Sequence, residues 1–192
     1  GITYEMTVNN IKDISTSGNT IVPNTSATYE AMLDPMQITV SGDDGYELYV
    51  NGTKIGDGSN WTVGTQYEAP TISGKNVIAI KGLDDQGIGG LVAQIRFMGM
   101  DIVSNETWKV QTSASDDWTQ IHYDDSSWPN AVSYGLHGST LPWSNYGDVS
   151  NISTGIGVKW IWSADQDNDN TVFFRIVLHT ENDFVAPEPP TW

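Results

Sequence analysis

Two short segments carry the carboxylates best placed to do chemistry in this sequence. Asp43 and Asp44 stand side by side before a glycine, in a turn between two strand-like segments. Asp165, Asp167 and Asp169 occupy every second position of a polar segment. Calcium takes roughly six to eight oxygen ligands in proteins, and carboxylates with nearby carbonyls are its usual ones. These five aspartates are therefore our candidate calcium ligands.

Both segments also have a purely structural interpretation. Asp-Asp-Gly is a favourable turn, because Asp hydrogen-bonds to nearby backbone and Gly accepts a positive φ. The alternating segment begins like an EF-hand loop, but its sixth and twelfth positions are Asn170 and Ile176 instead of Gly and Glu. It is therefore not an EF-hand, and both a cation-binding loop and a solvated hairpin loop stay open. Two other acid pairs, Asp84-Asp85 and Asp124-Asp125, are interpreted as a turn and a helix start.

Aromatic residues in polar loops form the second group of candidates. Sugars present flat C–H faces, so a solvent-facing Trp or Tyr ring is typical of many glycan sites. Trp61 follows a Gly-Ser-Asn segment, and the loop 142–146 contains Trp143 and Tyr146. Asn60 and Asn145 lie next to these rings and supply hydrogen-bonding groups. By contrast, Trp108, Trp160 and Trp162 lie in strand-like segments and are predicted to pack inside, the last two on one strand face.

Short strand-like segments separated by turn signals make up most of the chain, and no stretch of ten residues keeps a helical period. Asn51-Gly52 predicts a tight hairpin, since both residues accept positive φ. The pattern predicts an all-β fold, a β-sandwich of the jelly-roll type over residues 1–184, with elaborated loops around 112–158. Residues 185–192 are Pro-rich and predict a linker to a following domain. The expected strands are 36–40, 46–50, 77–80, 91–97, 159–162 and 171–178.

Three of these segments resemble galactose-binding-like jelly-roll domains: 40–52 (VSGDDGYELYVNG), 73–80 (SGKNVIAI) and 89–95 (GGLVAQI). Such domains occur as carbohydrate-binding modules and as accessory domains of rhamnosidase-type glycosidases. The resemblance continues in 123–129 (YDDSSWP) and in the Trp-x-Trp and Phe-Phe-Arg stretches near the C-terminus. In the rhamnosidase-type arrangement those last two stretches come first, so site residues do not transfer by order alone.

The resemblance implies a galactose-binding-like sandwich and a carbohydrate ligand. The PA14 adhesin family has a related turn, in which an adjacent aspartate pair binds Ca²⁺ that in turn coordinates sugar hydroxyls. For this chain, that relationship implies a calcium site at Asp43 and Asp44. In the jelly rolls that are not adhesins, the corresponding residues are often structural.

Charge and composition exclude several other function classes. Against 24 acidic residues the chain has 8 basic ones, a formal net charge of −16. A nucleic-acid site needs clustered Lys and Arg, and an anionic membrane surface attracts the same residues, so both partners are disfavoured. No apolar run approaches the roughly 20 residues of a membrane span, so we expect no direct membrane insertion. The chain has no cysteine, which rules out disulfides and thiolate metal sites.

Signals for catalysis are weak. The three histidines lie far apart without a metal-ligand spacing, and the sequence contains no Gly-x-Ser-x-Gly motif. Glycosidases use two carboxylates at defined separations, but with 24 acids some pair satisfies that requirement by chance. We therefore do not expect an enzyme.

The sequence predicts a non-catalytic carbohydrate-binding module of a secreted or cell-surface multidomain protein. Its partners would be a glycan or polysaccharide, with Ca²⁺ as cofactor, and the neighbouring domains of the same chain. Two alternatives stay open: a structural or spacer domain of a bacterial adhesin or appendage, and a small jelly-roll glycan-active enzyme.

Overall fold

The computed structural model describes residues 2–8, 25–31, 33–85 and 87–180 of the 192. The chain divides into two compact units, residues 1–33 and residues 34–192. Among the described residues, no helix has the length and apolar character needed to cross a membrane.

A separate β-hairpin makes up the first unit. Strand β1 (Ile2–Val8) pairs antiparallel with β2 (Thr25–Ala31) in a two-stranded sheet of its own. Sequence patterning alone does not separate this hairpin from the sandwich predicted for residues 1–184, since both show strand-like segments. The Pro-rich linker predicted for 185–192 lies outside the described residues.

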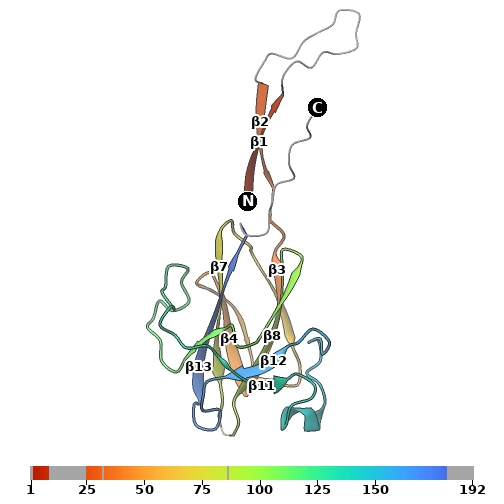
Figure 1. The fold of residues 1–192 in the computed structure, drawn as a ribbon, viewed down its shortest axis with the longest axis vertical. Helices are drawn as coiled ribbons and strands as arrows, with labels where there is room; N and C mark the ends of the chain where they lie inside the picture. Colours follow the sequence, from red (N-terminus) through yellow and green to blue (C-terminus); the bar gives the residue numbers. More distant parts are fainter. Residues whose placement is uncertain (1, 9–24, 32, 86, 181–192) are drawn as a thin grey trace, which may run out of the picture. The chain divides into compact units, whose positions relative to one another are not determined.

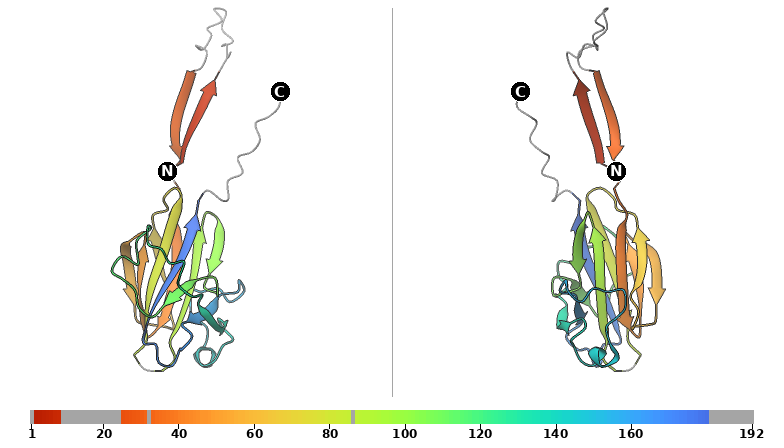
Figure 2. Two further views of the ribbon diagram at one scale, coloured as in Figure 1. Left: turned by 60° about the vertical axis from the view of Figure 1, so that its left-hand side comes forward. Right: turned by 90° about the vertical axis from the view of Figure 1, so that its right-hand side faces the viewer.

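The second unit is a sandwich of two antiparallel sheets that lie face to face (Figures 1 and 2). One sheet has the strand order β10-β13-β7-β4-β5, and the other has the order β11-β12-β8-β3-β6 with β9 beside β8. The strands are β3 (Met36–Asp43), β4 (Gly45–Val50), β5 (Thr53–Gly58), β6 (Thr65–Ala69), β7 (Lys75–Leu83), β8 (Gly90–Phe97), β9 (Met100–Val103), β10 (Lys109–Gln111), β11 (Val132–Leu136), β12 (Lys159–Trp162) and β13 (Thr171–His179).

The predicted strands and the predicted hairpin are confirmed. Asn51 and Gly52 both have positive φ, at 51° and 85°, and join β4 to β5 in a two-residue turn. The Trp-x-Trp segment forms β12, between β11 and β8, so it belongs to this sandwich. The all-β sandwich fold class predicted from the sequence is therefore correct.

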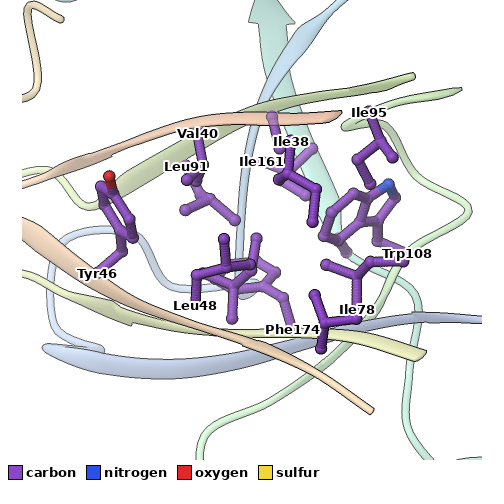
Figure 3. Packing of buried hydrophobic residues seen from close by; sticks show 14 of the residues in the cluster. Ile38, Val40, Tyr46, Leu48, Ile78, Leu91, Ile95, Trp108, Ile161 and Phe174 are labelled. Atoms are coloured by element: carbon purple, nitrogen blue, oxygen red, sulfur yellow. The ribbon is translucent and has the colours of Figure 1, made fainter. Parts of the chain in front are cut away.

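The main hydrophobic core lies between the two sheets (Figure 3). Alternate residues of each strand point inward, as the two-residue period of a strand requires. Ile78 and Ile80 of β7 belong to the same core as Ile38 and Val40 of β3, and all four are completely buried. Trp108 lies in this core, as the sequence predicts.

Two Trp-containing segments cover the outer faces of the sheets. Over the five-stranded sheet, Trp118 and Trp128 pack on Val77 and Ala79, the outward residues of β7. On the other sheet, Trp143, Val149, Ile152 and Val158 pack with Trp160 and with Val92, the outward residue of β8. We call the segment 137–158 the Trp143 loop. These segments lie within the predicted elaborated loops at 112–158.

Trp160 and Trp162 do not share a strand face, contrary to the sequence interpretation. Trp160 belongs to the outer cluster with Trp143, whereas Trp162 packs in the main core against Phe174, with ring centroids 5.5 Å apart. Strand β12 ends at Trp162, and only Ile161 is registered against β8, so the alternation is not maintained to the strand end. Gly82 and Gly89 leave room for the Trp162 ring.

The candidate residues gather at one end of the sandwich. Strand β3 begins at Met36, opposite Ala69, and ends at Asp43, opposite Gly90. The pairing of Gly45 and Thr171 with Leu83 places the 43–45, 83–90 and 163–170 connections together at that end. The start of β3 and the end of β13 lie at the opposite end (Figure 1).

Candidate functional site

A shallow pocket of about 370 Å³ brings together three residues that the sequence analysis singled out. Asp43, Trp61 and Trp143 line it, together with Pro142. Asp43 comes from the end of β3, Trp61 from the β5–β6 connection, and the other two from the Trp143 loop. The pocket therefore lies where three separate connections of the sandwich meet.

Asp43 and Trp143 are joined by a hydrogen bond that fixes one wall of the pocket. The indole Nε1–H of Trp143 donates to Oδ2 of Asp43 at 2.7 Å. Burial raises the pKa of Asp43, and the Trp143 hydrogen bond opposes this effect because it favours the carboxylate. Asp43 is half-buried, and it lines the pocket.

Trp143 is a buried residue, which changes the role predicted for it. Only 2% of its surface is exposed, and its ring stacks on Trp160 with centroids 4.2 Å apart and planes 11° from parallel. A Cβ on Gly90 would lie 2.5 Å from the Trp143 ring and 2.8 Å from the Trp160 ring, so the stack requires glycine there. Trp143 therefore gives the pocket a rigid edge and does not offer a free ring face.

Trp61, which also lines the pocket, is partly buried and packs against the cluster that contains Trp143. Its backbone carbonyl accepts a hydrogen bond from the Ser41 hydroxyl at 2.8 Å, which ties the loop to β3. Two backbone bonds join the same loop to the Trp143 loop: Gly64 N–H to Ser150 O at 2.8 Å and Ser150 N–H to Thr62 O at 3.0 Å. These contacts position Trp61 opposite Trp143.

The second residue of the aspartate pair faces a different acidic residue. Asp44 has a φ of 22°, and its Oδ2 accepts the backbone N–H of Asp85 at 2.7 Å. The adjacent Asp84 side chain is buried, at 6% exposure, and its Oδ2 has no hydrogen-bond partner among the described residues. Burial, followed by the charges of Asp44 and Asp43, raises the pKa of Asp84 to about 6. Neighbouring carboxylates of this kind require a shared proton or a cation.

Basic side chains do not compensate this group. The ion pairs that Lys and Arg make in the described part of the chain involve other acids: Glu47, Asp57, Asp101, Glu106 and Asp125. The sequence around Asp84 predicts a simple turn. The signal that could have singled it out is its position at the end of β7, which brings it next to the turn at Asp44.

The connection 163–170, which holds the alternating aspartates, lies beside the connection 83–90, which we call the Asp84 loop. Asp84 N–H donates to Asn170 O at 3.0 Å, and Gly89 N–H donates to Gln166 O at 2.8 Å. Inside the loop, Asp169 Oδ2 accepts the Ser163 hydroxyl at 2.6 Å, and the Asp165 carboxylate accepts the Asn168 amide at 2.9 Å.

Asp167, on the same loop, is exposed to solvent. Gln166 Oε1, like Asp84 Oδ2, is buried without a partner among the described residues. The two predicted calcium segments thus lie on connections at one end of the sandwich, linked through the Asp84 loop.

Among the described side chains, Asn60 and Asn145 do not line the pocket. Asn60 folds back on its own turn, where its Oδ1 accepts the Thr62 hydroxyl at 2.7 Å and the Thr62 N–H at 3.1 Å. Asn145 is exposed on the short 3₁₀ helix η1 (Trp143–Tyr146). The side chain of Tyr146 lies outside the described part of the structure.

Within the described ranges, no group of three or more His, Asp or Glu side chains is arranged to hold a metal ion. A cation at Asp44 and Asp84 would therefore take further ligands from backbone or amide oxygens, or from water. The orphaned oxygen of Asp84 fits such a role, because carboxylate, carbonyl and amide oxygens are the donor set of calcium.

No family model matches this chain, and no curated protein sequence matches it significantly. Among solved structures, it is similar to the lectin from Pleurotus ostreatus in complex with GalNAc, with a TM-score of 0.51 and 23% identity over 72% of this chain. The match spans 38% of the lectin chain. The apo form of that lectin matches with a TM-score of 0.47 and 21% identity, over 72% of this chain and 38% of the lectin chain. An α-L-rhamnosidase from Streptomyces avermitilis matches with a TM-score of 0.48 and 19% identity, over 77% of this chain and 14% of the rhamnosidase chain.

The likeness to the lectin shows the fold. It agrees with the two antiparallel sheets described above and with the resemblance found in the sequence. The chain therefore contains an antiparallel β-sandwich with the fold of the matched part of that lectin.

Proposed function

We propose that the sandwich is a non-catalytic glycan-binding module, with its binding site at the Asp43–Trp61–Trp143 pocket. The observation that carries this proposal is the meeting of a half-buried carboxylate and a partly exposed indole, delivered by separate connections, in one shallow hollow. An apolar ring beside a fixed polar acceptor is the combination that a sugar needs, because a sugar has both C–H faces and hydroxyl groups.

Each residue has a distinct role in this proposal. Trp61 covers one face of a sugar ring. Asp43 accepts a hydrogen bond from a sugar hydroxyl, or shares that hydroxyl with a cation, through the carboxylate that Trp143 holds in place. Trp143 acts through Asp43 and through the shape of the pocket, since its own ring is packed on Trp160.

Calcium forms the second part of the proposal, and we assign it to the aspartate pair together with Asp84. Burial and the nearby charges of Asp44 and Asp43 make the charge of Asp84 costly, and a divalent cation would offset that cost. When bound, calcium supplies open coordination positions for sugar hydroxyls. Asp165, Asp167 and Asp169 are a second candidate set, although the hydrogen bonds of Asp165 and Asp169 also fit a self-contained loop.

The biological setting is also part of the proposal. We place the module outside the cell or at the cell surface, as one part of a multidomain protein. The lectin match, which covers 38% of that protein, and the GalNAc in its crystal structure support a modular glycan binder. The absence of cysteine and the net charge of −16 are compatible with such a setting.

A glycan microarray probed in millimolar calcium, and again with a chelator, tests this function. We expect binding to a restricted set of glycans that the chelator abolishes. Silence in both conditions would favour a spacer domain over a binder. Release of reducing ends or unsaturated products from bound polysaccharide would show an enzyme instead.

Calcium binding is tested separately by thermal melting. The midpoint should rise with millimolar calcium by more than with equal magnesium, since only a ligand that prefers the folded state stabilises it. Equal shifts for the two ions would contradict a calcium site. Such a result would leave the glycan proposal to the array, where binding without calcium would be visible.

A further inference from the structure

The Trp143 loop is fastened at its base by a single buried histidine. His137 is 3% exposed, and its backbone N–H donates to Val158 O at 2.9 Å, which joins the two ends of the loop. Its imidazole Nε2 accepts the backbone N–H of Val149 at 2.9 Å, in the middle of the loop. Val149, Trp143 and Val158 belong to one buried cluster, so this bond supports the wall of the pocket.

This hydrogen bond requires the neutral form of histidine. A neutral imidazole has one acceptor nitrogen and one donor nitrogen, whereas both nitrogens donate in the protonated ring. Because Nε2 accepts from Val149, the proton of the neutral ring lies on Nδ1. Protonation of Nε2 would place an N–H against the Val149 N–H, so the bond would be replaced by repulsion between two donors.

The surroundings of His137 act on the charged ring in opposite directions: burial disfavours it, and the nearby acid Asp148 favours it. Nδ1 is buried without a hydrogen-bond partner among the described residues. Asp148, on the same loop, is the acid whose charge acts on the imidazole. On the neighbouring strand β12, Lys159 is paired with Glu106 at 2.7 Å.

Burial is the largest influence on this group and lowers the pKa of His137, while the Asp148 charge and the Ser153 carbonyl act in the opposite direction. A hollow of about 300 Å³ lined by His137, Gly138 and Asp148, among others, lies beside the ring and gives solvent a way to approach it.

We propose that His137 is an acid-sensitive latch, which holds the Trp143 loop closed when neutral and releases it when protonated. The sign follows from linkage. A histidine whose pKa is lowered in the folded state contributes its full stabilisation above its unfolded pKa of about 6.5 and loses it as the pH falls below that value. Release of the loop would remove the indole that holds Asp43. The latch itself does not depend on what the pocket binds.

Hydrogen exchange on the ligand-free protein tests this proposal. Exchange of the Val149 amide, corrected for intrinsic rates, is measured at about pH 7.5 and about pH 5. We expect protection in residues 143–150 to fall by about tenfold or more at the lower pH, while the amides of β3 and β7 stay protected. Equal protection at both values would overturn the latch.

Three variants identify the residue responsible. His137→Gln offers an amide oxygen that accepts from Val149 but does not titrate, so protection should become independent of pH. His122→Gln and His179→Gln change exposed histidines and should behave like the wild type. A pH response that persists in His137→Gln would contradict the proposal.

If His137→Gln does not fold at neutral pH, NMR titration of the wild-type imidazoles replaces it. His137 should then titrate together with the loss of Val149 protection. A His137 ring that stays neutral down to about pH 4.5 would overturn the proposal.

Discussion

The Trp143 indole and the Asp43 carboxylate are 100 residues apart in the sequence and hydrogen-bonded at 2.7 Å in the structure. This bond ties the Trp143 loop to the end of β3. It also orients the acidic group that the pocket offers to a ligand. We therefore expect changes at Trp143 to affect the site through Asp43.

Trp143→Phe removes this donor and keeps an aromatic ring on Trp160. Hydrogen bonds to charged groups contribute about 1.5–3 kcal/mol, and Asp43 is only half-buried, so we expect a loss of about 1.5 kcal/mol in urea unfolding. Glycan affinity should fall as well. Trp108→Phe is the control, because its indole bonds to Val103 O, away from the pocket: stability should fall there, but affinity should not. Unchanged affinity in Trp143→Phe would show that Asp43 does not need the indole.

Gly90→Ala tests the packing beneath the two stacked rings. The added Cβ would lie 2.5 Å from Trp143 and 2.8 Å from Trp160, so the stack must move. Overpacking of this kind costs about 1–3 kcal/mol, measurable as a lower urea midpoint. Gly155→Ala, in the same loop with open space around it, should change the midpoint little. Equal effects of the two changes would contradict the packing described for this wall.

Asp84→Asn tests two effects of the Asp84 carboxylate: its destabilisation of the calcium-free protein and its binding of calcium. Without calcium, we expect the variant to be more stable by about 2 kcal/mol at neutral pH, since it removes a buried charge whose pKa is raised to about 6. The rise in melting temperature with calcium should shrink at the same time. Asp85→Asn, at the exposed neighbour, should keep the calcium response. A full calcium response in Asp84→Asn would exclude Asp84 as a ligand.

Asp125→Asn tests the clamp that holds the segment over the five-stranded sheet. Arg175 is completely buried, and its Nε donates to Asp125 Oδ2 at 2.8 Å, while its guanidinium lies 5.0 Å from the centre of the Tyr123 ring. Removing one partner of a buried pair costs about 3 kcal/mol, because the other charge stays buried. Asp124→Asn is the matched control, since that exposed side chain caps Ser126 N–H and an amide oxygen can do the same. Thermal melting followed by circular dichroism gives the midpoint of each variant. Similar midpoints for the two variants would show that the Arg175–Asp125 pair does not stabilise the fold.

Much of the fold could be predicted from local sequence because its signals are local. Asn51-Gly52 specifies its hairpin through the φ values that those two residues accept. The alternating apolar residues of 36–40 and 77–80 specify strands through their two-residue period. The hairpin of residues 1–33 could not be separated from the sandwich in this way, because strand patterning does not show which sheet a strand joins.

The site was only partly predictable, because its contacts are long-range. Trp61 and Asp43 were chosen for their residue types and turns, and they do meet at the pocket. That Trp143 is buried against Trp160 depends on the room left at Gly90, and the role of Asp84 depends on the pairing of β4 with β7. The burial of Trp143 has no signal in the sequence near that residue, and the position of Asp84 at the end of a strand becomes informative only once β7 is paired with β4.

Comparison of wild type and Trp61→Ala on the same glycan array, in millimolar calcium, tests the central claim most directly. Trp61 supplies a partly buried indole at the pocket, and removing a ring that stacks on a sugar costs about 1–2 kcal/mol, so binding should weaken by about five- to thirtyfold. A melting curve first establishes that the variant is folded. The account predicts glycan binding by the wild type that folded Trp61→Ala loses. Wild-type silence across the array, or equal binding by the two proteins, would contradict it.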